Sequence, residues 1–207
     1  MSNPVAQSVN LFGLDRAALE AFVHSHGEPA FRARQLMQWL YQKRVTSFED
    51  MTDVSKSFRA RLPGIADVRL PALEAAQLSA DGTRKWVLRL ESGGAIETVY
   101  IPEANRGTLC ISSQVGCALD CAFCSTAQQG LQRNLTAAEI VSQVWFAIRT
   151  LVDELGKERP ISNVVFMGMG EPLANYNQVI TAIRSLQDDL GFGLSKRRVT
   201  VSTSRLV

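Results

Sequence analysis

The sequence predicts an α/β protein in which a small helical domain and a β-hairpin precede a parallel sheet. Apolar residues recur at helical spacing three times within residues 1–65. The apolar period changes to two between residues 72 and 101, which indicates strands. After residue 136, helical segments alternate with continuous apolar segments, and repeated βα units of this kind form parallel sheets.

Three short helices are expected in the N-terminal domain. They cover about residues 14–25, 29–43 and 55–62. Asp15 is a suitable N-cap for the first helix, and Gly27 follows its end. Pro29 can open the second helix because proline is tolerated in a first helical turn. Pro63 and Gly64 are expected to end the third helix.

A β-hairpin is expected next. Its strands are Arg84–Leu90 and Ala95–Ile101, joined by the turn sequence Glu91-Ser92-Gly93-Gly94. Glu97 lies in the second strand, where a carboxylate commonly marks the outward face.

The remaining elements follow the βα pattern. Thr136 and Glu139 form a capping box that opens a helix to about Leu155. Residues 163–167 form a continuous apolar run, as expected of a buried parallel strand. A helix over residues 175–190 and a strand over residues 198–202 complete the pattern.

Composition is that of a soluble globular protein. Hydrophobic residues make up 46% of the 207 residues and charged residues 20%, with a net charge of +2. No apolar run approaches the roughly 18 residues of a membrane span, and the first residues lack a secretory signal, so a cytoplasmic location without membrane partners is expected. Runs of basic residues are by themselves more often solvated faces than nucleic-acid contacts.

Three of the four cysteines are clustered. Cys117, Cys121 and Cys124 form a C-x3-C-x2-C triplet, and in a reducing compartment such a cluster favours metal binding over disulfides. A structural zinc site normally has four protein ligands, and no histidine or further cysteine lies near the triplet in the sequence. Three thiolates suit a [4Fe–4S] cluster whose fourth iron takes a non-protein ligand.

This triplet, with Phe123 before its last cysteine, resembles the signature of the radical S-adenosylmethionine (SAM) superfamily. The wider sequence is similar to the RNA adenine-C2 methyltransferases of that superfamily over the segments Gly107–Gly130, Asn134–Trp145, Val164–Leu173 and Gly191–Ser204. The resemblance implies a partial (β/α) barrel. Residues 102–207 would form about its first half, after a helical RNA-binding-like domain over residues 1–65 and a hairpin region over residues 66–101.

The resemblance also implies cofactors, partners and residue roles. The cofactors are a [4Fe–4S] cluster and SAM, and the partners are 23S rRNA, tRNA and an electron donor such as flavodoxin. Glu97 matches the family's proton acceptor and Cys110 its resolving cysteine, which closes a disulfide. The cluster ligands are Cys117, Cys121 and Cys124, and the SAM-binding residues are Gly170, Glu171 and Ser202.

The sequence departs from the family at one important point. The family carries its methyl group on a cysteine far downstream in a longer chain, and this sequence has no cysteine after Cys124. Arg205 also stands where the family has glycine. We therefore expect a truncated chain that cannot complete methyl transfer. Two alternatives stay open, namely an adenine-C8 methyltransferase of the same superfamily and a non-catalytic fragment that binds RNA or a cluster.

Overall fold

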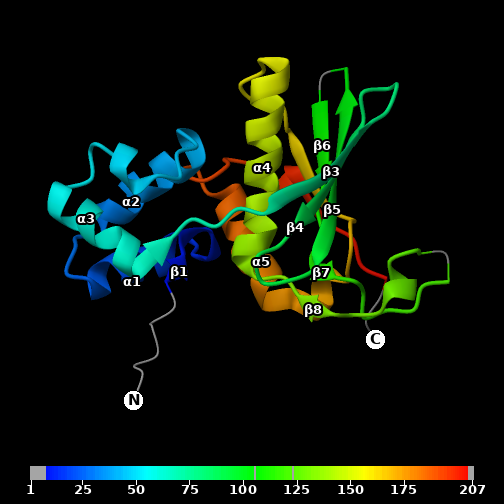
Figure 1. Ribbon diagram of the computed structural model, residues 1–207, viewed down its shortest axis with the longest axis horizontal. Helices are drawn as coiled ribbons and strands as arrows, with labels where there is room; N and C mark the ends of the chain where they lie inside the picture. Colours follow the sequence, from blue (N-terminus) through cyan, green and yellow to red (C-terminus); the bar gives the residue numbers. More distant parts are fainter. Residues whose placement is uncertain (1–7, 105, 123, 205–207) are drawn as a thin grey trace.

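Six strands form the main sheet, in the order β10-β9-β6-β5-β4-β3 (Figure 1). The computed structural model describes residues 8–104, 106–122 and 124–204, so Phe123 and Arg205 lie outside the described residues. The strands are β3 (Ala72–Leu78), β4 (Arg84–Arg89), β5 (Ala95–Glu103), β6 (Arg106–Cys110), β9 (Asn163–Phe166) and β10 (Val199–Val201).

The sheet combines an antiparallel and a parallel half. Strands β3 to β6 pair antiparallel, which confirms the predicted hairpin, whereas β6, β9 and β10 pair parallel, as the βα pattern predicts. β3 and β10 are the two edges, so among the described residues the sheet does not close into a barrel. Strand β5 runs past residue 101, so the hairpin is continuous with the parallel half, and the proposed division of the chain stays a prediction.

One face of the sheet is covered by α4 (Ala137–Leu155) and α5 (Tyr176–Gln187). Residues that alternate along the strands point to these helices and are buried, for example Leu88, Tyr100 and Val164. Helix α4 has the predicted boundaries, because the Thr136–Glu139 capping box satisfies its first N–H groups and Gly156 ends it in the left-handed conformation.

The N-terminal domain contains the three expected helices. They are α1 (Arg16–Ser25), α2 (Phe31–Met37, continued by a π-helical turn over Gln38–Gln42) and α3 (Lys56–Ile65). Asp15 caps α1 as predicted, accepting from the Ala18 N–H at 2.9 Å. The prediction that Pro63 ends the third helix is wrong, since α3 continues to Ile65. A proline so close to the helix end removes only one hydrogen bond, and buried Phe58 and Leu62 hold the helix in place.

This domain packs on the outer side of α4, so that α4 lies between it and the sheet (Figure 1). The Trp145 indole N–H of α4 donates to the Leu40 carbonyl at 2.7 Å, and both groups are buried. Phe12 packs between the Tyr41 and Trp145 rings, with centroids 5.7 and 6.0 Å away. A short parallel pairing of β1 (Val9–Asn10) with β2 (Ala66–Asp67) closes the domain. No helix in the described ranges has both the length and the apolar character needed to cross a membrane.

The aromatic contact between the two parts predicts a large effect of Phe12→Ala. The side chain is 0% exposed, so its removal leaves a cavity and is expected to lower the free energy of unfolding by about 3–5 kcal/mol. Phe31→Ala is the matched control, because Phe31 is 45% exposed. Urea titration measures both variants, and equal losses would contradict a packing role for Phe12.

Candidate functional site

The sequence-predicted site residues lie on the open face of the sheet and at the carboxyl ends of its parallel strands. The strands β6, β9 and β10 all end on this side. The chain leaves β6 toward the cysteines, leaves β9 through Gly168–Pro172, which we call the glycine turn, and leaves β10 at Ser202. Ligands of parallel α/β sheets bind at the carboxyl ends of strands, so this end of the parallel strands is the candidate binding site.

The three clustered cysteines lie on residues 116–132, which we call the cysteine loop. Its base is a pairing of two short antiparallel strands, β7 (Gln114–Val115) and β8 (Arg133–Asn134). The Cys117 N–H donates to the Gly130 carbonyl at 3.2 Å. A Cβ atom on Gly116 would lie 1.8 Å from that same carbonyl oxygen, and its φ is +76°, so only glycine fits there.

The donor chemistry of the loop fits an iron–sulfur cluster. Cys117, Cys121 and Cys124 are half-buried free thiols. The Leu119 N–H points to the Cys117 Sγ at 3.4 Å, and the Ala127 and Thr126 N–H groups hold the pKa of the Cys124 thiol below its usual value. Such N–H donors stabilise thiolates, which are the form that binds iron. Within the described ranges no three His, Cys, Asp or Glu side chains are grouped closely enough to hold a metal ion, so the ligand set stays a prediction.

The glycine turn packs directly against the segment that leads into the cysteine loop. The Ser113 and Gln114 N–H groups donate to the Met169 carbonyl at 2.8 and 3.2 Å. The buried Gln114 side chain accepts from the Glu171 N–H at 2.9 Å. Gly170 has φ +95°, and a Cβ atom there would lie 2.4 Å from the Gln114 Cβ. Glycine at position 170 is therefore required for this close approach.

Glu171 is buried, and its carboxylate bonds to the protein itself. One oxygen accepts from the Leu173 N–H at 3.0 Å, and the other from the Ser204 N–H at 3.0 Å. Burial opposes ionisation, but the Ser204 and Leu173 donors hold the pKa of Glu171 below its usual value. The carboxylate thus ties the glycine turn to the segment after β10, in which Ser202 is exposed.

Glu97 and Cys110 share the open face of the sheet, opposite the helices. Cys110 is the register partner of Val99, two residues after Glu97 on β5, so the two side chains are near neighbours on adjacent strands. The Lys85 ammonium on β4 lies 3.1 Å from a Glu97 carboxylate oxygen. Burial raises the pKa of the Cys110 thiol, which favours its protonated form at neutral pH.

A buried polar link, which the sequence analysis missed, joins this face to the glycine turn. The Ser112 hydroxyl donates to the Glu97 carbonyl at 2.7 Å and accepts from the Met169 N–H at 2.9 Å. The Gln143 side chain of α4 bonds to the Ser112 N–H and carbonyl at 2.9 and 3.0 Å, and accepts from the Thr98 hydroxyl. These pairs are separated by up to 57 residues in the sequence, so no local spacing indicates them.

Comparison with known families assigns two regions of the chain. Residues 9–68 match the family described as "Ribosomal RNA large subunit methyltransferase N-terminal domain". Residues 111–207 match the "Radical SAM superfamily".

Curated relatives match nearly the whole of this chain. A protein of Alcanivorax borkumensis named "Dual-specificity RNA methyltransferase RlmN" is 53% identical over 97% of this chain and 53% of its own length. A protein of the same name from Alkalilimnicola ehrlichii is 57% identical over 96% of this chain and 54% of its own length. The chain therefore spans about half the length of the curated relatives it matches.

A solved structure shares the fold. The crystal structure of a radical SAM methyltransferase from Sphaerobacter thermophilus superposes with a TM-score of 0.86 at 40% identity, over 96% of this chain and 57% of that chain. This similarity confirms the predicted fold class, in which the open sheet is part of a (β/α) barrel.

The contacts of Glu171 predict a pH-dependent effect of Glu171→Gln. In the variant, the glutamine NH₂ group would face either the Leu173 or the Ser204 N–H, and that donor would lose its acceptor. The variant is therefore expected to lose about 1–3 kcal/mol of unfolding free energy at pH 7. Because the pKa of Glu171 is lowered in the folded state, the stabilisation is present above the unfolded pKa and is lost as the pH falls through the folded pKa.

Urea titrations between pH 7 and pH 3 test this expectation. The gap between wild type and variant should narrow below about pH 4.3, the ordinary glutamate pKa. A gap that stays constant over this range would show that the Glu171 charge contributes nothing.

Proposed function

We propose, on the premise that this chain belongs to the RlmN family of radical SAM methyltransferases, that it binds a [4Fe–4S] cluster and SAM. The reaction to which its residues would contribute is adenine-C2 methylation of 23S rRNA and tRNA. The observation that carries the proposal is the cysteine loop with its three free thiols, whose preceding segment Ser113–Gln114 bonds to the glycine turn at the carboxyl ends of parallel strands.

Cys117, Cys121 and Cys124 would hold three irons of the cluster, since thiolates are its usual protein ligands. When bound, the cluster and SAM supply one-electron chemistry that can modify an unactivated aromatic carbon. The protein's part is to fix both groups at the carboxyl ends of the parallel strands and to exclude competing reactions.

The glycine turn and Ser202 would bind SAM. Each Glu171 oxygen accepts a main-chain N–H bond and keeps acceptor capacity for a ligand, while the backbone at Gly170 and the exposed Ser202 would supply the other contacts. Gly170 allows the close approach of Gln114 that fixes the backbone of this turn, and any side chain at position 170 would block it.

Glu97 would accept the proton that leaves adenine C2, and Cys110 would act as the resolving thiol. Glu97 is suited to this role because its side chain is 46% exposed on the open face, beside the Lys85 ammonium. Cys110, on the next strand, lies within the same part of this face.

RNA contacts are assigned to the N-terminal domain. Phe31 is 45% exposed, and it lines a cleft of about 340 Å³ together with Arg34 and with Arg16, whose guanidinium is paired with Asp188 and Asp189. Exposed aromatic rings beside guanidinium groups are suited to unpaired bases and phosphates.

An electron donor and a location complete the proposal. The chemistry requires a reductant, for which we propose a flavodoxin-like protein, and the RNA substrates imply the cytoplasm.

The cysteine triplet predicts iron binding that depends on three residues. Anaerobic reconstitution of the wild-type chain is expected to give about four irons per chain and a visible absorption that reductant bleaches. Cys117→Ala, Cys121→Ala and Cys124→Ala should each lose most of this iron, because two thiolates hold a cluster poorly.

Cys110→Ala is the matched control, since this cysteine lies outside the triplet and should be dispensable for iron. Zinc binding without iron–sulfur absorption in the wild type would refute the proposal. Equal iron loss in Cys110→Ala would refute the assignment of ligands.

The set of cysteines also predicts what this polypeptide cannot do. Three of its four cysteines are assigned to the cluster and one to resolution, so none remains to carry a methyl group. Incubation of residues 1–207 with 23S rRNA or tRNA transcripts, SAM and reductant is expected to yield no methylated adenine, although a salt-sensitive gel shift should report RNA binding.

Mass spectrometry of the RNA decides the outcome. A methyl group at adenine C2 would show that the four cysteines suffice, and a methyl group at C8 would favour the alternative enzyme. Absence of any gel shift at low salt would contradict the RNA-binding role of the N-terminal domain.

A further inference from the structure

We infer that Arg133 is a positioning residue that clamps the base of the cysteine loop to the hairpin turn and to helix α4. The inference rests on the proposed function in one respect, namely that the loop carries a cluster. Arg133 lies nine residues after the last cysteine of the triplet, on β8, at the point where the loop rejoins the fold.

The cysteine loop depends on its base because it has little other support. Strands β7 and β8 each contain two residues, so their pairing alone is a short ladder. Most of the described residues of the loop are exposed or only partly buried, and the one helical turn among them is a 3-10 turn over Ala127–Gln129. Segments with few buried contacts open locally at low free-energy cost, so the loop needs a further anchor.

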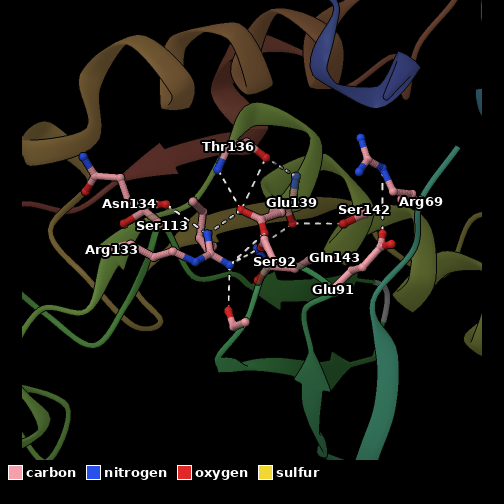
Figure 2. Close-up of polar contacts among 12 residues, drawn as sticks. Arg69, Glu91, Ser92, Ser113, Arg133, Asn134, Thr136, Glu139, Ser142 and Gln143 are labelled. Carbon is pink, nitrogen blue, oxygen red and sulfur yellow. Dashed lines mark hydrogen bonds and ion pairs between the residues drawn. The ribbon is translucent and has the colours of Figure 1, made fainter. Parts of the chain in front are cut away.

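The Arg133 guanidinium provides this anchor through several hydrogen bonds (Figure 2). It donates to both carboxylate oxygens of Glu139, at 2.8 and 2.9 Å. It also donates to the Gly93 carbonyl at 2.8 Å and to the Ser92 hydroxyl, both in the hairpin turn. A bidentate arginine–carboxylate pair fixes geometry as well as distance, which a lysine cannot do.

Glu139 connects the clamp to the first turn of α4. The same carboxylate accepts from the Thr136 N–H at 2.9 Å and so completes the capping box of the helix. Burial opposes its ionisation, but donors from Arg133, Ser92 and Thr136 hold the pKa of Glu139 below its usual value. The pair is also well enclosed, with the Arg133 and Glu139 side chains 29% and 14% exposed. It is therefore stronger than an ordinary surface ion pair.

The clamp also fixes the hairpin relative to the loop. A Cβ atom on Gly94 would lie 2.7 Å from the Val115 side chain, so the hairpin turn touches the loop base directly. Strand β5 begins at the next residue, Ala95, and carries Glu97. Arg133 thus fixes the position of the loop base relative to β5, the strand that carries the proposed proton acceptor.

A second arginine offers a matched control at the far end of the same helix. Arg84 on β4 pairs with Glu154 in the last turn of α4 at 2.9 Å, with side chains 15% and 48% exposed. It joins the same hairpin to the same helix, but away from the cysteine loop. Loss of this pair should affect stability without affecting the loop.

The experiment compares Arg133→Met and Arg133→Lys with Arg84→Met, first in cluster-free protein. Hydrogen exchange of amides in residues 116–132 is expected to speed up about tenfold in Arg133→Met and less in Arg133→Lys, since lysine keeps the charge but not the bidentate geometry. Arg84→Met should leave these amides within about twofold of wild type.

Iron retention after anaerobic reconstitution and gel filtration is the second readout. Arg133→Met is expected to retain at least about threefold less iron than Arg84→Met at matched thermal stability, because a mobile loop base releases its ligands more readily. Equal loop exchange or equal iron in these two variants would overturn the inference. If the wild type takes up no iron, the proposed function fails, and the exchange measurement still decides whether Arg133 holds the loop.

Discussion

Main-chain hydrogen bonds between the segment after β6 and the glycine turn after β9 determine where the proposed functional groups lie. The Ile111 N–H bonds to the Val165 carbonyl, the Gly168 N–H to the Ile111 carbonyl and the Ser113 N–H to the Met169 carbonyl, at 2.9, 3.1 and 2.8 Å. These bonds extend the parallel pairing beyond the ends of both strands. As a result the chain leading to the cysteines and the turn assigned to SAM leave the sheet side by side.

Side-chain amides satisfy the backbone where this pairing ends. Buried backbone groups need partners, and Gln143 supplies both for Ser112, while Gln114 supplies one for Glu171. Both glutamines are fully buried. Buried polar networks of this kind specify a single arrangement, because each unsatisfied member would cost free energy. The same residues therefore account for local stability and for the alignment of the two loops.

Local patterns predicted much of the fold, and long-range pairs limited the prediction of the site. The boundaries of α4 follow from Thr136, Glu139 and Gly156, which all lie at the ends of the helix. The continuation of α3 past Pro63 could not be predicted from local signals. It depends on the burial of Phe58 and Leu62 in the folded protein, which outweighs the one hydrogen bond that the proline removes. The cysteines are a local motif and are visible in the sequence. The Lys85–Glu97 and Arg133–Ser92 contacts join separate elements, 12 and 41 residues apart, and need the folded register.

The three glutamates near the site differ in what their environment allows them to do. Glu139 and Glu171 are held ionised by several donors each, so a proton added to either would disrupt the contacts that join loops to helices. Glu97 pairs with Lys85 alone in the part of the chain that the structure describes, and nearly half of its side chain surface faces solvent. This single exposed ion pair is worth little to stability. Of the three carboxylates, Glu97 is thus the one whose side chain joins no loop to a helix, which supports the role proposed for it.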